Sequence, residues 1–431
     1  MVAAFLFISF AVLLFIGTPI AICLGVSSVG AMLIQGLQGI SRPIDVIMGT
    51  LPRLVSSSTS KFVLLAIPFF ILSGNIMEKT GISQKLIDLA QSCVGHIKGG
   101  LALVCVFVAC FFAAISGSGP ATVAALGLII IPAMVKVGYK PAFAAALMAT
   151  AGAIGVIIPP SITFVVYGSI ADTSIGTLFI AGILPGLLMA LGLVIMSLWV
   201  GRKADLAVLP KASGKERLKA FKDAFWGLLM PVIILGGIYG GIFTPTEAAA
   251  VSAVYGLFVG VFIYKTVKWK QFYQILVDST CTTATVMFIT AAASLFAYVL
   301  TRARINIAIS TALTQITNGN AIIFLLIVNV VLLIAGCFLD STSALYIFTP
   351  LFVPVAQALG IDLVHMGVVM IVNLAIGLVT PPVGVNLYVA CGIAKCDLKE
   401  ISIAVLPLMI VSLIVLLLVT YIPQISLILV K

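Results

Sequence analysis

The chain repeats one distinctive interruption of its apolar segments. The sequence AIGVIIPP at 153–160 returns as AIGLVTPP at 375–382. The same spacing relates three further pairs of residues, which are Pro132 with Pro354, Gly138 with Gly360, and Pro185 with Pro407. Proline cannot donate a backbone hydrogen bond and clashes with the preceding turn, so each Pro-Pro pair ends a regular helix. The sequence therefore predicts two copies of one module, and matched breaks of this kind indicate a binding site near the middle of a bilayer.

The composition is that of a membrane protein. Apolar residues make up 62% and charged residues 8% of the 431 residues, whereas a soluble domain carries about 25% charged residues. Uncharged runs at 101–135, 141–171 and 405–430 far exceed the ~10-residue strands of a barrel, so the expected fold is an all-α polytopic membrane protein. The net charge of +10 comes from basic residues in short loops between spans, which fits membrane topology and argues against nucleic-acid binding.

The two copies are expected to meet near residue 212, inside the polar and basic connection 202–222. A weaker match of Thr18-Pro19 with Thr244-Pro245, together with the basic loops, predicts that the second half inserts upside down relative to the first. The first apolar run has no Lys or Arg ahead of it, which predicts a retained span and not a cleaved signal peptide. The predicted bounds are 1–212 for the first repeat, with a re-entrant hairpin at about 101–135 and a broken helix at 141–169, and 213–431 for the second, with a hairpin at about 320–356 and a broken helix at 364–391.

Each predicted hairpin is too long for one span, because about 30 Å of hydrocarbon needs only about 20 helical residues. Small polar residues interrupt both segments in the middle, at 116–120 and at 340–343, and these stretches are expected to be the hairpin tips. A single tilted or kinked helix with a Gly-rich bend is the alternative that the sequence leaves open.

Unwound backbone is tolerated at membrane depth only where it lines a cavity or is buried in protein. Its free carbonyl groups suit a cation such as Na⁺, and half-helix N-termini attract anionic groups. Asp340 is the only charge between Arg304 and Asp362, and an intramembrane carboxylate is a functional-site hypothesis by default. We expect a cation beside Asp340. A helix-capping Asp in a water-filled vestibule is the alternative, and the two roles are compatible.

Motifs for energy conversion and catalysis are missing from the sequence. No G-x-x-x-x-G-K-[ST] occurs, so the chain has no P-loop and must draw on an ion gradient or on a separate ATPase subunit. No H-E-x-x-H, no G-x-S-x-G and no cluster of His, Asp and Glu is present, which argues against an enzyme and against an organic cofactor.

Several segments carry a likeness to a known family. They are AIPFFILSGNIM (66–77), FFAAISGSGPATVAALGLIIIPAM (111–134), IIPPSI (157–162) and LFIAGILPG (178–186) in the first half, and GCFLDSTSA (336–344), GIDLVHMGVVMIVNLAIGLVTPPVGVNLYV (360–389) and VLP (405–407) in the second. In these segments, and over nearly its whole length, the sequence resembles the large membrane subunit of TRAP transporters, the tripartite ATP-independent periplasmic family.

The resemblance implies an inverted-repeat ion-transporter fold that works by an elevator motion, with the hairpins and broken helices as the mobile unit. Transport would be secondary and Na⁺-coupled, and would import an organic acid delivered by a soluble periplasmic binding protein. A small four-span membrane subunit would brace the fixed spans as a separate polypeptide, since this chain begins at the large-subunit region. The expected location is the bacterial inner membrane, with many spans surrounded by lipid.

The resemblance also implies sites at the hairpin tip and helix break of each half. The sodium-binding residues carried over are Ser116, Ser118, Gly155 and Pro160 in the first half, and Asp340 and Thr380 in the second. The substrate would lie between the tips, close to Ser118, Ser161, Asn386, Ser341 and Ser343.

The overall resemblance favours N-acetylneuraminate, a sialic acid, as the substrate, with C4-dicarboxylates as the alternative. A stand-alone Na⁺/anion symporter that needs no binding protein is a further alternative. A channel or a purely structural component is disfavoured, because two matched half-helix sites suit alternating access better than a pore.

Overall fold

The computed structural model describes residues 2–37, 44–203 and 206–430, and every regular element in these ranges is helical. The first half contains α1 (Val2–Phe15), α2 (Ile20–Leu37), α3 (Ile44–Thr59), α4 (Ala66–Lys79), α5 (Ile82–Val94), α6 (Gly100–Ser116), α7 (Gly119–Lys136), α8 (Pro141–Ala153), α9 (Ile162–Ala171) and α10 (Ile175–Lys203). The second half contains α11 (Gly214–Tyr239), α12 (Pro245–Phe258), α13 (Trp269–Arg302), α14 (Ile305–Thr317), α15 (Ala321–Gly336), α16 (Ser341–Ala358), α17 (Leu363–Gly377), α18 (Val385–Ala394), α19 (Leu398–Tyr421) and α20 (Gln424–Leu427). Eight of the described helical segments are long and apolar enough to cross a membrane, which confirms the predicted all-α polytopic class.

The second half begins with a clear helix-start signal. The Glu216 N–H donates to Ser213 Oγ over 3.3 Å, and the Ser213 N–H donates to Glu216 Oε2 over 2.7 Å. This reciprocal capping box satisfies two N–H groups that the first turn leaves unpaired, so α11 starts directly after Ser213. The predicted boundary near residue 212 therefore falls in a non-helical connection, although the predicted upside-down insertion of the second half stays a prediction.

Both predicted hairpins are pairs of short helices joined by a tight break. In the first, α6 ends and α7 begins around Gly117, whose φ of +60° is a left-handed conformation that costs glycine little. In the second, α15 ends at Gly336 and α16 begins at Ser341, so the break covers 337–340. The predicted second tip at 340–343 is therefore placed slightly too late. Asp340 caps the new helix, and the three residues after it form its first turn.

Both predicted broken helices are interrupted at their Pro-Pro pairs. The first runs through α8 and a short 3₁₀ turn at Ile154–Val156 before α9 resumes at Ile162. The second ends α17 at Gly377 and resumes with α18 at Val385. Prolines at both breaks remove backbone donors, which explains why regular helix does not continue.

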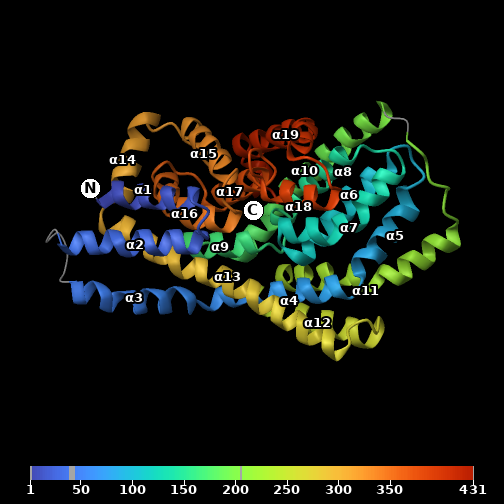
Figure 1. Cartoon of the computed structure of the whole chain (residues 1–431), viewed down its shortest axis with the longest axis horizontal. Coiled ribbons are helices and arrows are strands. Elements are labelled where there is room, and N and C mark those ends of the chain that lie inside the picture. Colours follow the sequence, from blue (N-terminus) through green and yellow to red (C-terminus); the bar gives the residue numbers. More distant parts are fainter. Residues whose placement is uncertain (1, 38–43, 204–205, 431) are drawn as a thin grey trace.

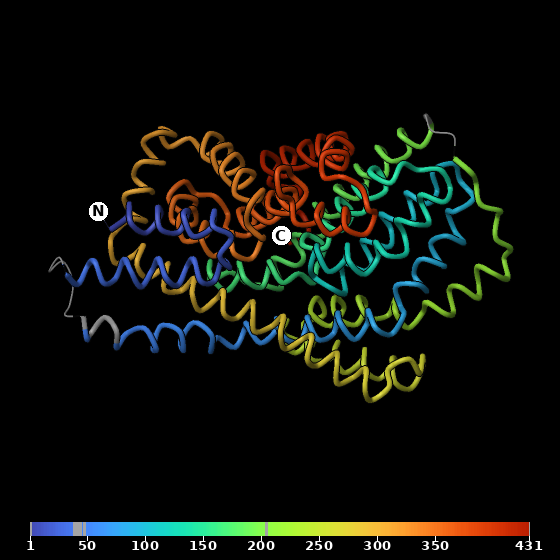
Figure 2. The backbone as a smooth tube through the Cα atoms, in the orientation of Figure 1, coloured from blue at the N-terminus to red at the C-terminus, as the bar shows by residue number. Residues whose placement is uncertain are grey.

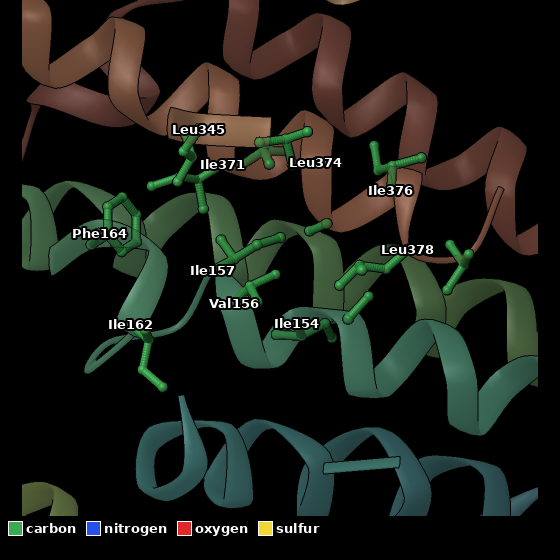
Figure 3. Close-up of a cluster of buried hydrophobic side chains, with 14 of the residues drawn as sticks. Ile154, Val156, Ile157, Ile162, Phe164, Leu345, Ile371, Leu374, Ile376 and Leu378 are labelled. Carbon is green, nitrogen blue, oxygen red and sulfur yellow. The ribbon is translucent and has the colours of Figure 1, made fainter. Parts of the chain in front are cut away.

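The hairpins and broken helices of the two halves pack against each other across the repeat. Helix α7 of the first hairpin contacts α18, and α16 of the second hairpin contacts α9. Hydrogen bonds also join the broken helices of the two halves: Asn386 Nδ2 donates to the Ala149 carbonyl over 3.0 Å, and the Tyr167 hydroxyl donates to the Leu363 carbonyl over 2.7 Å. Figure 3 shows apolar side chains from the first break facing those around the second, including Ile154 and Leu378. We call α6–α10 together with α15–α20 the central unit.

A second group of helices borders the central unit. Helix α13 contacts α2, α3 and α4, and α4 also contacts α12. We call α1–α4 together with α11–α13 the frame, and α5 and α14 lie between the frame and the central unit. Figure 1 shows α3, α4, α12 and α13 toward one edge of the molecule and α15 and α19 along the opposite edge. In Figure 2, the blue tube of α3 and the yellow tube of α13 lie close together.

Candidate functional site

A cavity of about 260 Å³ lies where the central unit meets the frame. Both hairpin tips reach it, through residues 116–121 of the first hairpin and 340–342 around the start of α16. The frame supplies the facing wall, with Asn75 and Glu78 on α4 and Thr282 on α13. The cavity therefore collects polar groups from both halves of the chain.

Oxygen atoms gather at the first tip. Ser116 Oγ and Thr122 Oγ1 are 2.8 Å apart, and Thr122 Oγ1 donates to the Ser118 carbonyl over 2.8 Å. Gly155 of the first break packs directly against this group, because a Cβ atom there would be 3.1 Å from both the Ser118 carbonyl oxygen and Thr122 Oγ1. Glycine at 155 thus lets the break approach the oxygen cluster closely.

The first tip also lies against the backbone that follows the Pro-Pro pair. A Cβ atom on Gly117 would be 3.0 Å from the Pro160 carbonyl oxygen. The hydroxyls of Ser161 and Thr163 are 2.7 Å apart, and both donate to the Val156 carbonyl, over 2.8 and 3.0 Å. Thr163 lines the cavity, whereas Ser161 is fully buried beside it.

The second tip is organised by one carboxylate. Asp340 Oδ2 accepts hydrogen bonds from the backbone N–H groups of Thr342 and Ser343, each over 3.1 Å, and the Ser343 hydroxyl donates to Asp340 Oδ1. The helix-capping role weighed for this residue is therefore present in its geometry, and the cation expected beside it stays a prediction. Ser341 Oγ is buried at the cavity and has no hydrogen-bond partner among the residues that the structure describes. An unpaired buried hydroxyl of this kind can bind a ligand atom at little cost.

The second break carries two further predicted residues. The Thr380 hydroxyl donates to the Ile376 carbonyl over 2.8 Å, and Thr380 does not line the cavity. Asn386 is fully buried against the first tip, since a Cβ atom on Gly119 would be 3.2 Å from its Nδ2 and 3.3 Å from its Oδ1. Its Oδ1 accepts no hydrogen bond from the described part of the chain, so the amide keeps one free acceptor beside the tip.

The structure thus brings most of the predicted site residues together. Ser116, Ser118, Asp340 and Ser341 line the cavity, while Gly155, Pro160, Ser161, Ser343 and Asn386 are buried in its surroundings. Thr380, half-buried in the second break, has no contact with the cavity.

The charged groups of the cavity are all acidic. Its lining, within the described residues, contains the two carboxylates Glu78 and Asp340 and no Lys, Arg or His. The described part of the chain also has no group of three His, Cys, Asp or Glu side chains that could hold a metal ion. Hydroxyl and carbonyl oxygens are the main ligands on offer, and they suit a hard cation.

Glu78 lines the cavity but was not predicted from the sequence. It lies just before Lys79, in a stretch that has the polarity of an interfacial helix. Asp340, in contrast, is the only charged residue in a long apolar stretch. A signal was present in the helical spacing. Ile71, Gly74, Asn75 and Glu78 follow at intervals that place them on one face of a helix, and this is the face that lines the cavity.

Comparison with known proteins identifies the family. A sequence model described as "Tripartite ATP-independent periplasmic transporter, DctM component" matches residues 7–425. The chain belongs to this DctM family. The family match and the eight candidate spans make it a multi-pass protein of the bacterial inner membrane, and a large permease subunit of a TRAP transporter.

Its relatives carry different names. The chain is 48% identical to the C4-dicarboxylate TRAP transporter large permease protein DctM of Pseudomonas aeruginosa, over 86% of each chain. It is 45% identical to the isethionate TRAP transporter permease protein DctMQ of Oleidesulfovibrio alaskensis, over 97% of this chain and 65% of that one. It is 39% identical to the sialic acid TRAP transporter large permease protein SiaM of Vibrio cholerae, over 97% of this chain and 96% of that one.

A solved structure supports the fold independently of close sequence similarity. The YdaH transporter of Alcanivorax borkumensis, described as having an unusual topology, superposes with a TM-score of 0.63 over 88% of each chain at 14% sequence identity. At this identity the likeness concerns the fold alone.

Proposed function

We propose that this DctM protein imports an organic acid by Na⁺-coupled secondary transport, with the cavity between central unit and frame as the substrate site. The observation that carries the proposal is the charge of that cavity, which holds two carboxylates and no basic side chain among its described lining residues. An organic anion there needs cations to offset the negative charge, so anion binding and cation binding are coupled by electrostatics. Na⁺ is the cation that the oxygen-rich tips favour.

We propose one Na⁺ site at each hairpin tip. At the first tip, Ser116, Ser118, Gly155 and Pro160 are the proposed ligands, and the short contacts among the first three support it. At the second tip, we propose Asp340 with Thr380 from the neighbouring break. The Gly384 N–H donates to the Cys337 carbonyl over 3.3 Å, which joins this break to the second tip.

The substrate is proposed to lie between the tips, near Ser118, Ser161 and Asn386 on one side and Ser341 and Ser343 on the other. Helices α7 and α16 begin at this cavity, and helix N-termini attract anionic groups. The cavity of about 260 Å³ is slightly smaller than the ~300–1,000 Å³ usual for drug-sized ligands, which favours a small acid. We therefore propose a C4-dicarboxylate, with N-acetylneuraminate as the second candidate.

We propose that the central unit moves against the frame in an elevator cycle. A small four-span membrane subunit and a periplasmic binding protein are the proposed partners, as the TRAP family name implies. A stand-alone symporter is the competing proposal, and it differs in needing no binding protein.

The test is uptake of radiolabelled succinate and N-acetylneuraminate into proteoliposomes that contain this chain and its small subunit. Each acid is measured with and without an inward Na⁺ gradient, and with and without the cognate binding protein. We expect succinate uptake that needs both the gradient and the binding protein. Uptake that ignores the Na⁺ gradient would contradict the coupling, and uptake without binding protein would favour the stand-alone symporter.

A further inference from the structure

One charged group at the cavity is no ligand in the function proposed above, although it contributes to the negative charge of the cavity. Glu78 lies in the last turn of α4, half-buried, and lines the cavity with Gly74 and Asn75. Within the described residues, its carboxylate has no hydrogen bond and no ion pair. A carboxylate that lines a cavity of an apolar protein without a partner is a candidate for a functional role.

Glu78 belongs to the frame, whereas the hairpin tips belong to the central unit. Asn75 Nδ2, on the same face of α4, donates to Ser279 Oγ of α13 over 2.9 Å, which fixes this face within the frame. The same face touches the first tip, because a Cβ atom on Gly74 would be 3.3 Å from the Ser116 Cα atom. A substrate held between the tips therefore meets Glu78 only while the central unit is in the position seen here.

The charges along α4 and α13 indicate which side of the membrane this position serves. Two lysines, Lys79 and Lys85, lie at and after the end of α4, and three lysines lie at 265–270 around the start of α13. The opposite ends of these helices carry fewer basic residues, which are Lys61 before α4 and Arg302 and Arg304 at the end of α13. An excess of Lys and Arg marks the cytoplasmic end of a span. The cavity is lined by residues from the middle of α4 and α13 toward their lysine-rich ends, among them Glu78 and Thr282. The cavity therefore lies on the cytoplasmic side of the frame, in an inward-facing arrangement.

We propose that Glu78 is a release carboxylate: a fixed negative charge on the frame that lowers the affinity for an organic anion in the inward-facing arrangement. The proposal rests on the proposed function and deepens it. A transporter that releases its substrate into the cell must bind that substrate more weakly in the inward-facing state. A charged group that the substrate approaches in only this state supplies such a difference in affinity. Asp340 cannot do so, because it lies on the hairpin tip and travels with the substrate.

The expected effect is large enough to measure. Two unit charges about 10 Å apart, at an effective dielectric constant of about 20, repel strongly enough to change an equilibrium constant roughly ten-fold. The effect should shrink at high salt, because dissolved ions screen the charges that they can reach.

The test measures the electrostatic potential in the cavity directly, without a known substrate. Thr342 lines the cavity on the second tip, and Thr342→Cys supplies a thiol there. In the full chain in lipid nanodiscs, its reaction rates with an anionic and a cationic methanethiosulfonate reagent are measured by mass spectrometry of the labelled peptide. Adding Glu78→Gln should raise the anionic-to-cationic rate ratio at least about ten-fold, whereas Glu78→Asp should change it little.

Asp278→Asn is the matched control. It removes the same charge from the neighbouring α13 side of the frame, but Asp278 does not line the cavity. A change below two-fold with Glu78→Gln, or an equal change with Asp278→Asn, would overturn the proposal. Succinate affinity, measured in parallel, should rise in Glu78→Gln. Failure of the unmodified chain to bind succinate would contradict the proposed substrate, while the reagent ratio would still decide the role of Glu78.

Discussion

Asp340 both caps α16 and lines the cavity, and two substitutions separate these roles. Asp340→Asn keeps a good capping side chain but removes the charge. We expect thermal stability in detergent to stay near that of the unmodified protein, while the Na⁺ concentration needed for half-maximal uptake rises. Asp340→Ala should lose about 1 kcal/mol of stability as well, since the cap is gone. Unchanged Na⁺ dependence in Asp340→Asn would remove this carboxylate from the ion site.

Glycine at 377 is required by backbone contact between α15 and α17. A Cβ atom on Gly377 would be 2.6 Å from the Cα atom of Gly336, and backbone at that distance cannot rotate away. Gly377→Ala should therefore cost at least about 1–3 kcal/mol of folding stability. Gly392→Ala in α18 is the control, because nothing lies within 4 Å of its Cβ position. It should be neutral or stabilising by up to about 1 kcal/mol. Equal thermal shifts in the two variants would contradict the close approach.

At the scale of single elements, the breaks were predictable and the cavity wall was not. The Pro-Pro pairs fix both helix breaks through local backbone chemistry, and Gly117 and Asp340 mark the two hairpin breaks in the same way. The second tip was placed slightly late, because Asp340 is a cap and not the middle of a loop. Glu78 was not predicted as a cavity residue, because its position depends on which helix packs against the first tip. A tertiary contact of that kind leaves only a weak pattern in a single sequence.

One hydrogen bond joins the frame side to helix α9 of the central unit. Lys61, which precedes α4, donates from Nζ to the Ser169 carbonyl of α9 over 2.8 Å. A contact made in one arrangement favours that arrangement, and an exposed charged contact contributes up to about 1 kcal/mol. Lys61→Met should therefore shift the population away from the inward-facing state, and slow the labelling of Thr342→Cys up to about five-fold.

Lys98→Met is the control for that shift. Lys98 Nζ donates to the Arg202 carbonyl over 3.5 Å, and this bond joins α10 to the residues just before α6, so it lies within the central unit. Its loss should leave the labelling rate unchanged. A similar slowing in both variants would show that the Lys61 contact does not set the balance between states.

At the scale of the whole molecule, the hairpins and broken helices of both halves form one body. The first hairpin packs on the second broken helix and the second hairpin on the first broken helix, so neither hairpin can move alone without losing contacts. The frame meets this body mainly through α4 and α13, which also wall the cavity. A movement of the central unit along these two helices would carry both tips, with substrate and Na⁺ between them, from one side of the membrane to the other.

The most direct measurement is a pair of distances by electron paramagnetic resonance, with exposed Cys93 and Cys281 replaced by Ser. Spin labels at exposed Leu128 of α7 and Val254 of α12 report the central unit against the frame, and labels at Leu128 and Ile403 of α19 report the central unit alone. With Na⁺ and succinate, the account predicts a new distance population for the first pair and an unchanged distribution for the second. A changed distance within the central unit, or none between Leu128 and Val254, would contradict it.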